Sequence, residues 1–221
     1  MPIVLYHMPS SSPCRAVRLT AATVGVDLNL KLTNLMDSEQ LKPEFIKMNP
    51  QHVIPTIDDN GFYLWESRAI MGYLVDQYGK NDSLYPKDPK KRALVNQRLF
   101  FDQGTLYQAF SDYFYPLIRG GPKDEVKFEK IGKVLELLDG FLEGEQYVAG
   151  KNLTIADISL ATTIGQFEVI KYDLSKYKNV SKWFDRMKKE VNKYVEIHEE
   201  GMKSYNALVE AYMKKMKGNS Q

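Results

Sequence analysis

The sequence predicts a small α/β unit with the element order βαβαββα, followed by an all-helical unit. Strand-like and helix-like stretches alternate through residues 1–79, and Asn60-Gly61, the strongest short-range hairpin signal, stands between two apolar runs. Apolar side chains in residues 90–221 recur instead at helical spacing. Residues 80–89 hold two prolines and no such period, so we expect a linker between domains 1–79 and 90–221.

The first half of the α/β unit should contain two strands and two helices. A strand is expected at residues 3–6, and the helix after it is capped by a serine, carries Pro13 in its first turn and ends near Gly25. Leucines alternate with polar residues through 28–32, which indicates a half-buried strand. A short helix is expected at 43–48.

The second half should add a hairpin and a helix. Residues 56–59 and 62–65 flank the Asn-Gly turn, so they are expected to pair as antiparallel strands. Helical spacing then runs from Glu66 to Tyr78 and stops at Gly79, a residue suited to the end of a helix.

The all-helical unit should contain several long helices. Thr154 and Asp157 form a capping box, which marks a helix start and indicates a role in folding. The expected helical spans are 90–118, 124–142, 154–170, 178–190 and 194–217.

The composition excludes several classes of function. The 221 residues include 30 basic and 28 acidic ones, a net charge of +2 that gives no strong field for nucleic acid or an anionic membrane. Cys14 is the only cysteine, so it can form no disulfide within the chain and no cysteine-based zinc site. We find no nucleotide-binding or metal motif and expect no metal. The sequence has no signal segment or membrane span, so we expect a cytoplasmic protein.

The start of the first helix resembles that of thioredoxin-like domains. Redox members of that group have Cys-x-x-Cys there, whereas this chain has Ser11-x-x-Cys14 before a later Ile54-Pro55. Cys14 should face the core, where a thiol is inert. A glutaredoxin-like reductase is therefore a weak hypothesis.

The whole chain resembles the cytosolic glutathione S-transferases, most closely the insect Delta class and next the Epsilon class. The resemblance implies an enzyme that conjugates the glutathione thiolate to hydrophobic electrophiles in xenobiotic detoxification, and it implies a homodimer. It rests on five segments in order: 11–17 (SSPCRAV), 41–45 (LKPEF), 49–55 (NPQHVIP), 65–70 (WESRAI) and 83–86 (SLYP).

The resemblance assigns the hydroxyl that stabilises the thiolate to Ser11, with Ser12 as the competitor. Lowering a thiol pKa from about 8.5 by roughly two units takes nearly 3 kcal/mol. A hydrogen bond to the charged sulfur contributes about 1.5–3 kcal/mol, and the helix N-terminus up to about 1 kcal/mol. Both serines could instead serve only as helix caps. Ser10 stands where Delta members often have glycine.

The resemblance also implies how glutathione is held. Ile54-Pro55 should be a cis peptide whose preceding backbone groups pair with the cysteinyl residue, and His52 should contact the glycyl carboxylate. Gln40 stands where the family often has a histidine, so that second glycyl contact lacks a charge. The residues implied to bind glutathione are Ser11, Gln51, His52, Val53, Ile54, Pro55, Glu66, Ser67 and Arg68.

A cluster of aromatic residues indicates where the electrophile binds. Several rings recur at spacings of three and four in the fourth helix, which would form an apolar stripe near the cleft between domains. The same spacing is also typical of an ordinary helical core. With two residues from the first strand and loop, the candidates are Tyr6, Met8, Tyr107, Phe110, Tyr113, Phe114 and Tyr115.

The alternative function is a non-catalytic protein of the same fold that binds glutathione or hydrophobic ligands. The complete set of Ser11, Ile54-Pro55 and Glu66-Ser67 argues against it, because a scaffold does not need a thiolate site. The sequence does not distinguish the physiological electrophile, or peroxidase from dehydrochlorinase activity.

Overall fold

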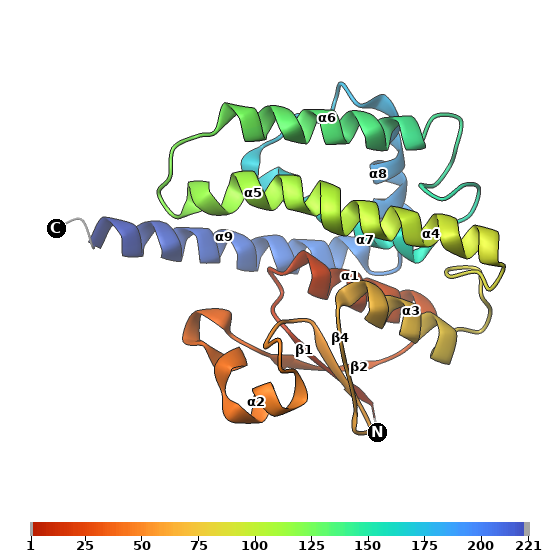
Figure 1. Ribbon diagram of the computed structural model, residues 1–221, viewed down its shortest axis with the longest axis horizontal. Helices are drawn as coiled ribbons and strands as arrows, with labels where there is room; N and C mark the ends of the chain where they lie inside the picture. Colours follow the sequence, from red (N-terminus) through yellow and green to blue (C-terminus); the bar gives the residue numbers. More distant parts are fainter. Residues whose placement is uncertain (1, 219–221) are drawn as a thin grey trace.

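The computed structural model describes the backbone of residues 2–218 and the side chains of residues 2–211. A four-stranded sheet with its helices forms the first part of the chain, and a larger helical domain forms the rest (Figure 1). The predicted fold class, a thioredoxin-like βαβαββα unit followed by an all-helical domain, is confirmed.

The sheet has the strand order β2-β1-β3-β4. Its central strand β1 (Ile3–His7) pairs in parallel with β2 (Leu28–Leu32) and antiparallel with β3 (Thr56–Asp59), which pairs antiparallel with β4 (Phe62–Trp65). The β3–β4 turn takes positive φ angles at Asn60 (53°) and Gly61 (92°), as the predicted Asn-Gly hairpin requires.

Three helices cover the sheet. Helices α1 (Ser12–Val24) and α3 (Ser67–Tyr78) lie between the sheet and the helical domain, and α2 (Pro43–Met48) lies away from that domain (Figure 1). Helix α1 begins and ends as its sequence predicts, with Ser11 as its N-cap and Gly25 at φ 87° after its last turn. The start of α1 is thereby fixed directly after β1.

The prediction that β2 is half-buried is wrong for most of the strand. Leu30 and Leu32 are 42% and 61% exposed, although they alternate with polar residues. The reason is topological, because β2 is an edge strand with a neighbouring strand on one side only.

The helical domain contains six long helices within the described residues. The predicted span 90–118 is interrupted, because a π-helical turn at Asp102–Leu106 separates the first two of these helices. The predicted span 154–170 changes to a 3₁₀ turn after Gly165. The helices are α4 (Pro89–Phe101), α5 (Tyr107–Ile118), α6 (Glu125–Phe141), α7 (Ile155–Gly165), α8 (Lys178–Glu190) and α9 (Tyr194–Gly218).

Asp157 ties the start of α7 to its surroundings. Its buried carboxylate accepts hydrogen bonds from the backbone N–H and hydroxyl of Thr154 (both 2.9 Å), the N–H of Val148 (2.8 Å) and Nε1 of Trp183 (3.0 Å). Burial raises the pKa of Asp157, and these donors oppose the rise. The predicted pairing of Thr154 with Asp157 is confirmed, and it also holds α8 through Trp183.

The two domains share one hydrophobic core. Helix α1 packs against α7 and α9 as well as against α3. Polar contacts cross the same boundary, from Ser12 Oγ to Gln166 Oε1 (3.0 Å) and from Arg18 to Glu200 (2.6 Å). The loop that carries Ser11 is thus held from both domains. Among the described helices, none is both long and apolar enough to cross a membrane.

Candidate active site

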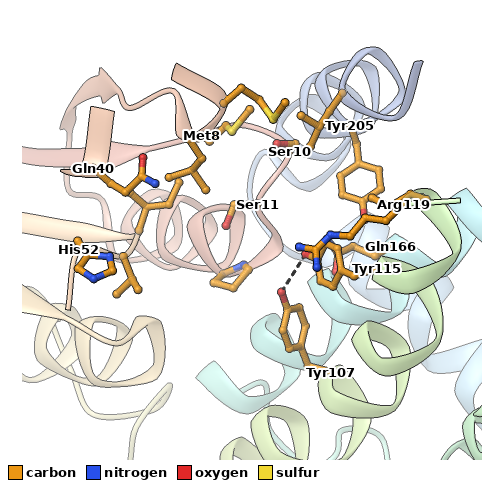
Figure 2. Close-up of a pocket in the computed structure, with 17 residues that line it drawn as sticks. Met8, Ser10, Ser11, Gln40, His52, Tyr107, Tyr115, Arg119, Gln166 and Tyr205 are labelled. Atoms are coloured by element: carbon orange, nitrogen blue, oxygen red, sulfur yellow. Dashed lines mark hydrogen bonds between the residues drawn. The ribbon is translucent and has the colours of Figure 1, made fainter. Parts of the chain in front are cut away.

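A cavity of about 380 Å³ lies between the two domains, and Figure 2 shows its lining. The loop after β1, the turn of the Ile54-Pro55 loop, α5, α9 and the 3₁₀ turn after α7 all contribute to it. We call it the interdomain cavity. Its lining residues are Met8, Ser10, Ser11, Pro13, Leu35, Met36, Gln40, His52, Val53, Ile54, Tyr107, Tyr115, Ile118, Arg119, Gln166, Tyr205 and Leu208.

Ser11 points into this cavity from the N-terminal end of α1 (Figure 2). Its Oγ accepts a hydrogen bond from the backbone N–H of Cys14 at 3.4 Å. That contact uses an oxygen lone pair, so the hydroxyl proton can be donated into the cavity. The positive end of the α1 dipole favours a negative charge at the same place.

Ser12 has a different environment from its neighbour. It is buried, and its hydroxyl donates to Oε1 of Gln166 (3.0 Å). It does not line the interdomain cavity, so Ser11 is the one of the two predicted candidates that does.

Arg15 braces the loop that carries Ser11. Its side chain is only 1% exposed, and its Nη1 donates to the carbonyl oxygens of Ser10 (3.1 Å) and Pro9 (3.4 Å). Helix α9 approaches it so closely that a Cβ on Gly201 would lie 2.4 Å from Arg15 Cδ. The pKa of Arg15 is lowered, chiefly because its guanidinium is buried.

The thiol of Cys14 is fully buried in α1. Burial raises its pKa to about 11, although the Ser11 hydroxyl stabilises the thiolate in part. A thiol with that pKa carries almost no thiolate at neutral pH, so it is a poor nucleophile. The expectation that Cys14 faces the core is confirmed.

The Ile54-Pro55 peptide is cis, as the resemblance implies. The Val53 carbonyl oxygen accepts from Nδ2 of Asn49 (3.0 Å) and Oγ1 of Thr56 (2.8 Å), which fixes the turn. In the described part of the chain, no protein group pairs with the backbone N–H or C=O of Ile54. These two groups, beside the cavity, can therefore bind a peptide backbone.

His52 precedes this turn and lines the interdomain cavity. Its backbone φ is 45°, a left-handed conformation that costs a non-glycine residue some energy and is more frequent at functional sites. Its N–H donates to the Asn49 carbonyl (2.9 Å). Gln51 and Pro55, which flank the lining residues in sequence, do not line the cavity.

Glu66, Ser67 and Arg68 do not line the interdomain cavity. Glu66 has φ 68° directly before α3, and Ser67 is buried. Arg68 donates to Ser67 Oγ (3.1 Å) and pairs with the buried Asp102 (2.5 Å). Two of the three open instead on the α3–α4 hollow, lined by Glu66, Arg68, Ala69, Tyr85, Asn96, Leu99, Phe100 and Gln103.

Three of the seven predicted electrophile residues line the interdomain cavity: Met8, Tyr107 and Tyr115. The hydroxyls of the two tyrosines lie 3.4 Å apart (Figure 2). The pKa of Tyr107 is raised, chiefly by burial. Tyr107 therefore presents a neutral hydroxyl to the cavity at physiological pH.

The other four predicted rings lie outside the interdomain cavity. Tyr6 packs edge-on against Phe45, with ring centres 5.6 Å apart, because its β1 position faces the inside of the first domain. Phe110 and Phe114 stack on each other at 5.2 Å in the core. Tyr113 packs against Phe128 on another side of α5. The predicted stripe thus contains both core and cavity residues, because neighbouring positions on a helix face different ways.

Several lining residues were not predicted from the sequence. Leu35 and Met36 come from the segment after β2, and Tyr205 and Leu208 come from α9. Residues so distant in the chain meet only through helix packing. Ile118 and Arg119 could have been found, because the glycines at 120 and 121 mark the end of α5 beside the predicted tyrosines. Gln166 had no sequence signal.

Among the residues that the structure describes, we find no group of three or more His, Cys, Asp or Glu that could hold a metal ion. The polar groups that line the interdomain cavity are hydroxyls, backbone amides, the side-chain amides of two glutamines, one histidine and one arginine, beside an apolar wall.

Comparison with known families matches both domains. Residues 1–76 match the family described as "Glutathione S-transferase, N-terminal domain". Residues 107–191 match "Glutathione S-transferase, C-terminal domain".

Three solved insect structures are similar to this chain. A delta-class glutathione transferase of Nilaparvata lugens is 57% identical, covers 96% of this chain and 100% of its own, and has a TM-score of 0.92. A glutathione transferase of Bombyx mori is 47% identical over 96% and 98% of the two chains (TM-score 0.90). An epsilon-class glutathione S-transferase of the housefly, Musca domestica, is 36% identical over 95% and 98% (TM-score 0.88).

Proposed function

Because this chain belongs to the glutathione S-transferase family and conjugates glutathione to electrophiles, we propose that Ser11 holds and stabilises the glutathione thiolate in the interdomain cavity. The observation that carries this assignment is the divergence of two adjacent serines. Ser11 lines the cavity at the N-terminus of α1, whereas Ser12 is buried and bonded to Gln166.

The Ser11 hydroxyl lowers the pKa of glutathione by favouring the charged sulfur. A hydrogen bond to a thiolate contributes about 1.5–3 kcal/mol and the helix end up to about 1 kcal/mol. One pKa unit corresponds to 1.36 kcal/mol, so together they lower the thiol pKa by roughly two units. The thiol proton leaves to solvent, and the sulfur attacks an electrophilic carbon held nearby.

The remainder of glutathione extends from Ser11 along the cis turn. The backbone N–H and C=O of Ile54 pair with the cysteinyl residue, and His52 and Gln40 face the glycyl carboxylate. Glu66 and the N-terminal end of α3 receive the γ-glutamyl group. The full proposed set is Ser11, Gln51, His52, Val53, Ile54, Pro55, Glu66, Ser67 and Arg68.

Arg68 acts in this set as a positioning residue. Its guanidinium is occupied by Asp102, which also accepts hydrogen bonds from Ser159 (2.5 Å) and Thr163 (2.7 Å) of α7. The contact from Arg68 to Ser67 therefore anchors the start of α3 to the helical domain.

The electrophile binds on the helical-domain side of the same cavity, against Met8, Tyr107 and Tyr115. Ile118 and Tyr205 extend this wall. The wall is largely apolar, which suits hydrophobic acceptors of the kind removed in xenobiotic detoxification.

The organisation of the protein belongs to the same proposal. The domains extend over residues 1–79 and 90–221 with a linker at 80–89. The end of α3 at Tyr78 and the start of α4 at Pro89, the last residue of that linker, support this division. The protein is a cytoplasmic homodimer. Phe100, 73% exposed beside the α3–α4 hollow, supports an interface on that side.

The two serines provide a matched test. Ser11→Ala should raise the pKa of bound glutathione by about 1–2 units and lower kcat about 10- to 100-fold at neutral pH, with glutathione affinity mostly retained. Ser12→Ala should leave that pKa unchanged and lower the unfolding free energy by about 1 kcal/mol. The measurements are ultraviolet absorbance of the bound thiolate against pH and turnover of an activated aryl halide. A raised pKa in Ser12→Ala alone would move the role to Ser12.

A further inference from the structure

Arg119 has a fixed place at the end of α5. Its backbone N–H donates to the carbonyls of Tyr115 (3.3 Å) and Pro116 (3.2 Å). Gly120, at φ 87°, donates to Leu117 (3.1 Å), and Gly121 donates back to Pro116 (3.0 Å). A Cβ on Gly121 would lie 2.9 Å from the Pro116 carbonyl oxygen, so this turn tolerates no larger residue. The chain therefore leaves α5 directly after Arg119.

The Arg119 side chain turns into the interdomain cavity. In Figure 2 its guanidinium lies beside the hydroxyls of Tyr107 and Tyr115, with Ser11 on the other side of the cavity. No carboxylate lies within 4.0 Å of it in the described part of the chain. Among the lining residues it is also the only one with a permanent charge.

Hydroxyl donors gather around the same end of the cavity. Tyr205 is buried, lines the cavity and has a hydroxyl without a protein hydrogen-bond partner among the described residues. Burial raises the pKa of both Tyr205 and Tyr107, which keeps their hydroxyls protonated. One cation and several O–H groups without a carboxylate form a site suited to an anionic group.

From this arrangement we infer that Arg119 makes the enzyme selective for aromatic electrophiles that carry a carboxylate on the side away from the reacting carbon. The inference rests on the proposed function, since it places the glutathione thiolate at Ser11 and the acceptor between Ser11 and Arg119. The carboxylate then meets the guanidinium and the tyrosine hydroxyls, while the ring packs against the apolar wall.

The reaction itself is an aromatic substitution. The glutathione sulfur forms a bond to the ring carbon that bears a halogen, and the negative charge passes to the electron-withdrawing substituents. The carbon–halogen bond then breaks, the halide ion leaves with its electron pair, and a thioether remains. No proton is gained or lost in these two steps. Arg119 orients the acceptor and stabilises the charge that moves toward it.

Solvent limits the size of the effect. Arg119 is exposed, so its attraction for an anion is screened in the way that surface ion pairs are. We therefore expect an effect of about 10-fold on kcat/KM, the factor that corresponds to roughly 1.4 kcal/mol. The effect should shrink as the salt concentration rises.

The test compares two acceptors that differ in charge at one position, 4-chloro-3,5-dinitrobenzoate and its uncharged carboxamide. Arg119→Met removes the charge and keeps the length of the side chain, and Arg119→Lys keeps a charge.

Lys123→Met is the matched control, because Lys123 lies just beyond the same turn but lines a different cavity, behind α5. We expect Arg119→Met to lower kcat/KM about 10-fold for the benzoate and less than about 2-fold for the carboxamide. Arg119→Lys should retain most of the benzoate rate, and Lys123→Met should change neither.

Several outcomes would overturn the inference. They are equal losses on the two acceptors in Arg119→Met, no loss on the benzoate, or the same loss in Lys123→Met. Turnover of the carboxamide by the unaltered enzyme confirms in the same assay that the transferase reaction occurs. If neither acceptor were turned over, the proposed function of the cavity would fail, and the inference with it.

Discussion

Two adjacent serines at the start of α1 have the same side chain but different roles, because only one of them donates its hydroxyl proton to a protein partner among the described residues. Ser12 is committed to Gln166, a residue 154 positions away, whereas Ser11 retains a proton for a ligand. The same applies to Arg15, whose guanidinium is used to hold the backbone of Pro9 and Ser10. Some polar residues around this loop therefore hold its backbone in place, whereas Ser11 is available to bind a ligand in the cavity.

His7 gives a prediction at this scale. It is buried at the end of β1, and burial together with the nearby charge of Arg18 lowers its pKa to about 4, against a smaller opposing effect of Glu200. The unfolded chain, with a histidine pKa of about 6.5, binds the proton more readily. Native stability should therefore fall as the pH drops from about 6.5 toward 4.

The measurement is urea unfolding at pH 7 and pH 5. Between these pH values, the free energy of unfolding should fall by about 1–2 kcal/mol more in the unaltered chain than in His7→Gln, which lacks the titrating group. Equal losses in the two proteins would show that His7 is not the group responsible. Carboxylates elsewhere affect both proteins alike, so the difference isolates His7.

The sequence predicted what individual residues are able to do better than it predicted which other residues they contact. The serine at the helix start, the cis Ile54-Pro55 peptide and the buried Cys14 follow from local pattern and resemblance, and the structure has all three. Phe110 and Phe114 were placed at the cavity because helical spacing does not tell which face of α5 meets the core. That choice depends on the packing of α7 and α9.

At the scale of elements, α9 holds the loop that carries Ser11 by close approach. Gly201 allows it to pass over Arg15 and the Pro9 carbonyl oxygen, which a Cβ would meet at 2.4 and 2.9 Å. Gly140 in α6 has open space at the corresponding position, with nothing within 4 Å of the place that a Cβ would take. A side chain is therefore sterically excluded at Gly201 but not at Gly140.

Alanine at these two sites should give opposite results. Gly140→Ala should stabilise the protein by up to about 1 kcal/mol, because alanine favours the helix. Gly201→Ala should destabilise it by about 1–3 kcal/mol through overpacking and lower kcat/KM by displacing the loop that carries Ser11. Thermal unfolding and turnover of an aryl halide measure the two effects. Stabilisation by Gly201→Ala with unchanged turnover would mean that α9 does not hold the loop.

The sequence predicted the elements that have a local signal, but not the features that depend on how the elements are arranged. Strands, hairpin and helices were expected near their observed places, because each has a local period and a local stop signal. The π-helical turn at Asp102–Leu106 has no such signal. The exposure of Leu30 and Leu32 follows from sheet order, which no local pattern determines.

At the scale of the whole molecule, the interdomain cavity exists only where the two domains meet. Residues of α1, α5 and α9 line it or support it, and the hydrophobic core runs without a break through both domains. The division into two domains could be predicted from the change in periodicity. The positions of Arg119, Gln166 and Tyr205 around one cavity could not, because they depend on how whole helices dock.

The proposed homodimer gives the last prediction. Phe100 is 73% exposed on α4, next to the α3–α4 hollow, and a two-fold interface would bury it twice. Phe100→Asp should therefore shift the protein from dimer to monomer, as measured by sedimentation velocity. Val126, 78% exposed on α6, provides the control, and Val126→Asp should leave the dimer intact. A dimer that withstands Phe100→Asp would place the interface elsewhere.

The π-helical turn between α4 and α5 has a consequence for how this chain would respond to the loss of one residue. Within it, the N–H of Tyr107 bonds to the carbonyl of Asp102, five residues earlier, so the turn holds one residue more than an α-helix would. Each residue advances a helix by about 100°. Loss of a single codon here would leave an ordinary α-helical turn and keep Tyr115, Ile118 and Arg119 facing the cavity, whereas the same loss between Tyr107 and Tyr115 would rotate all three away from it by about 100°.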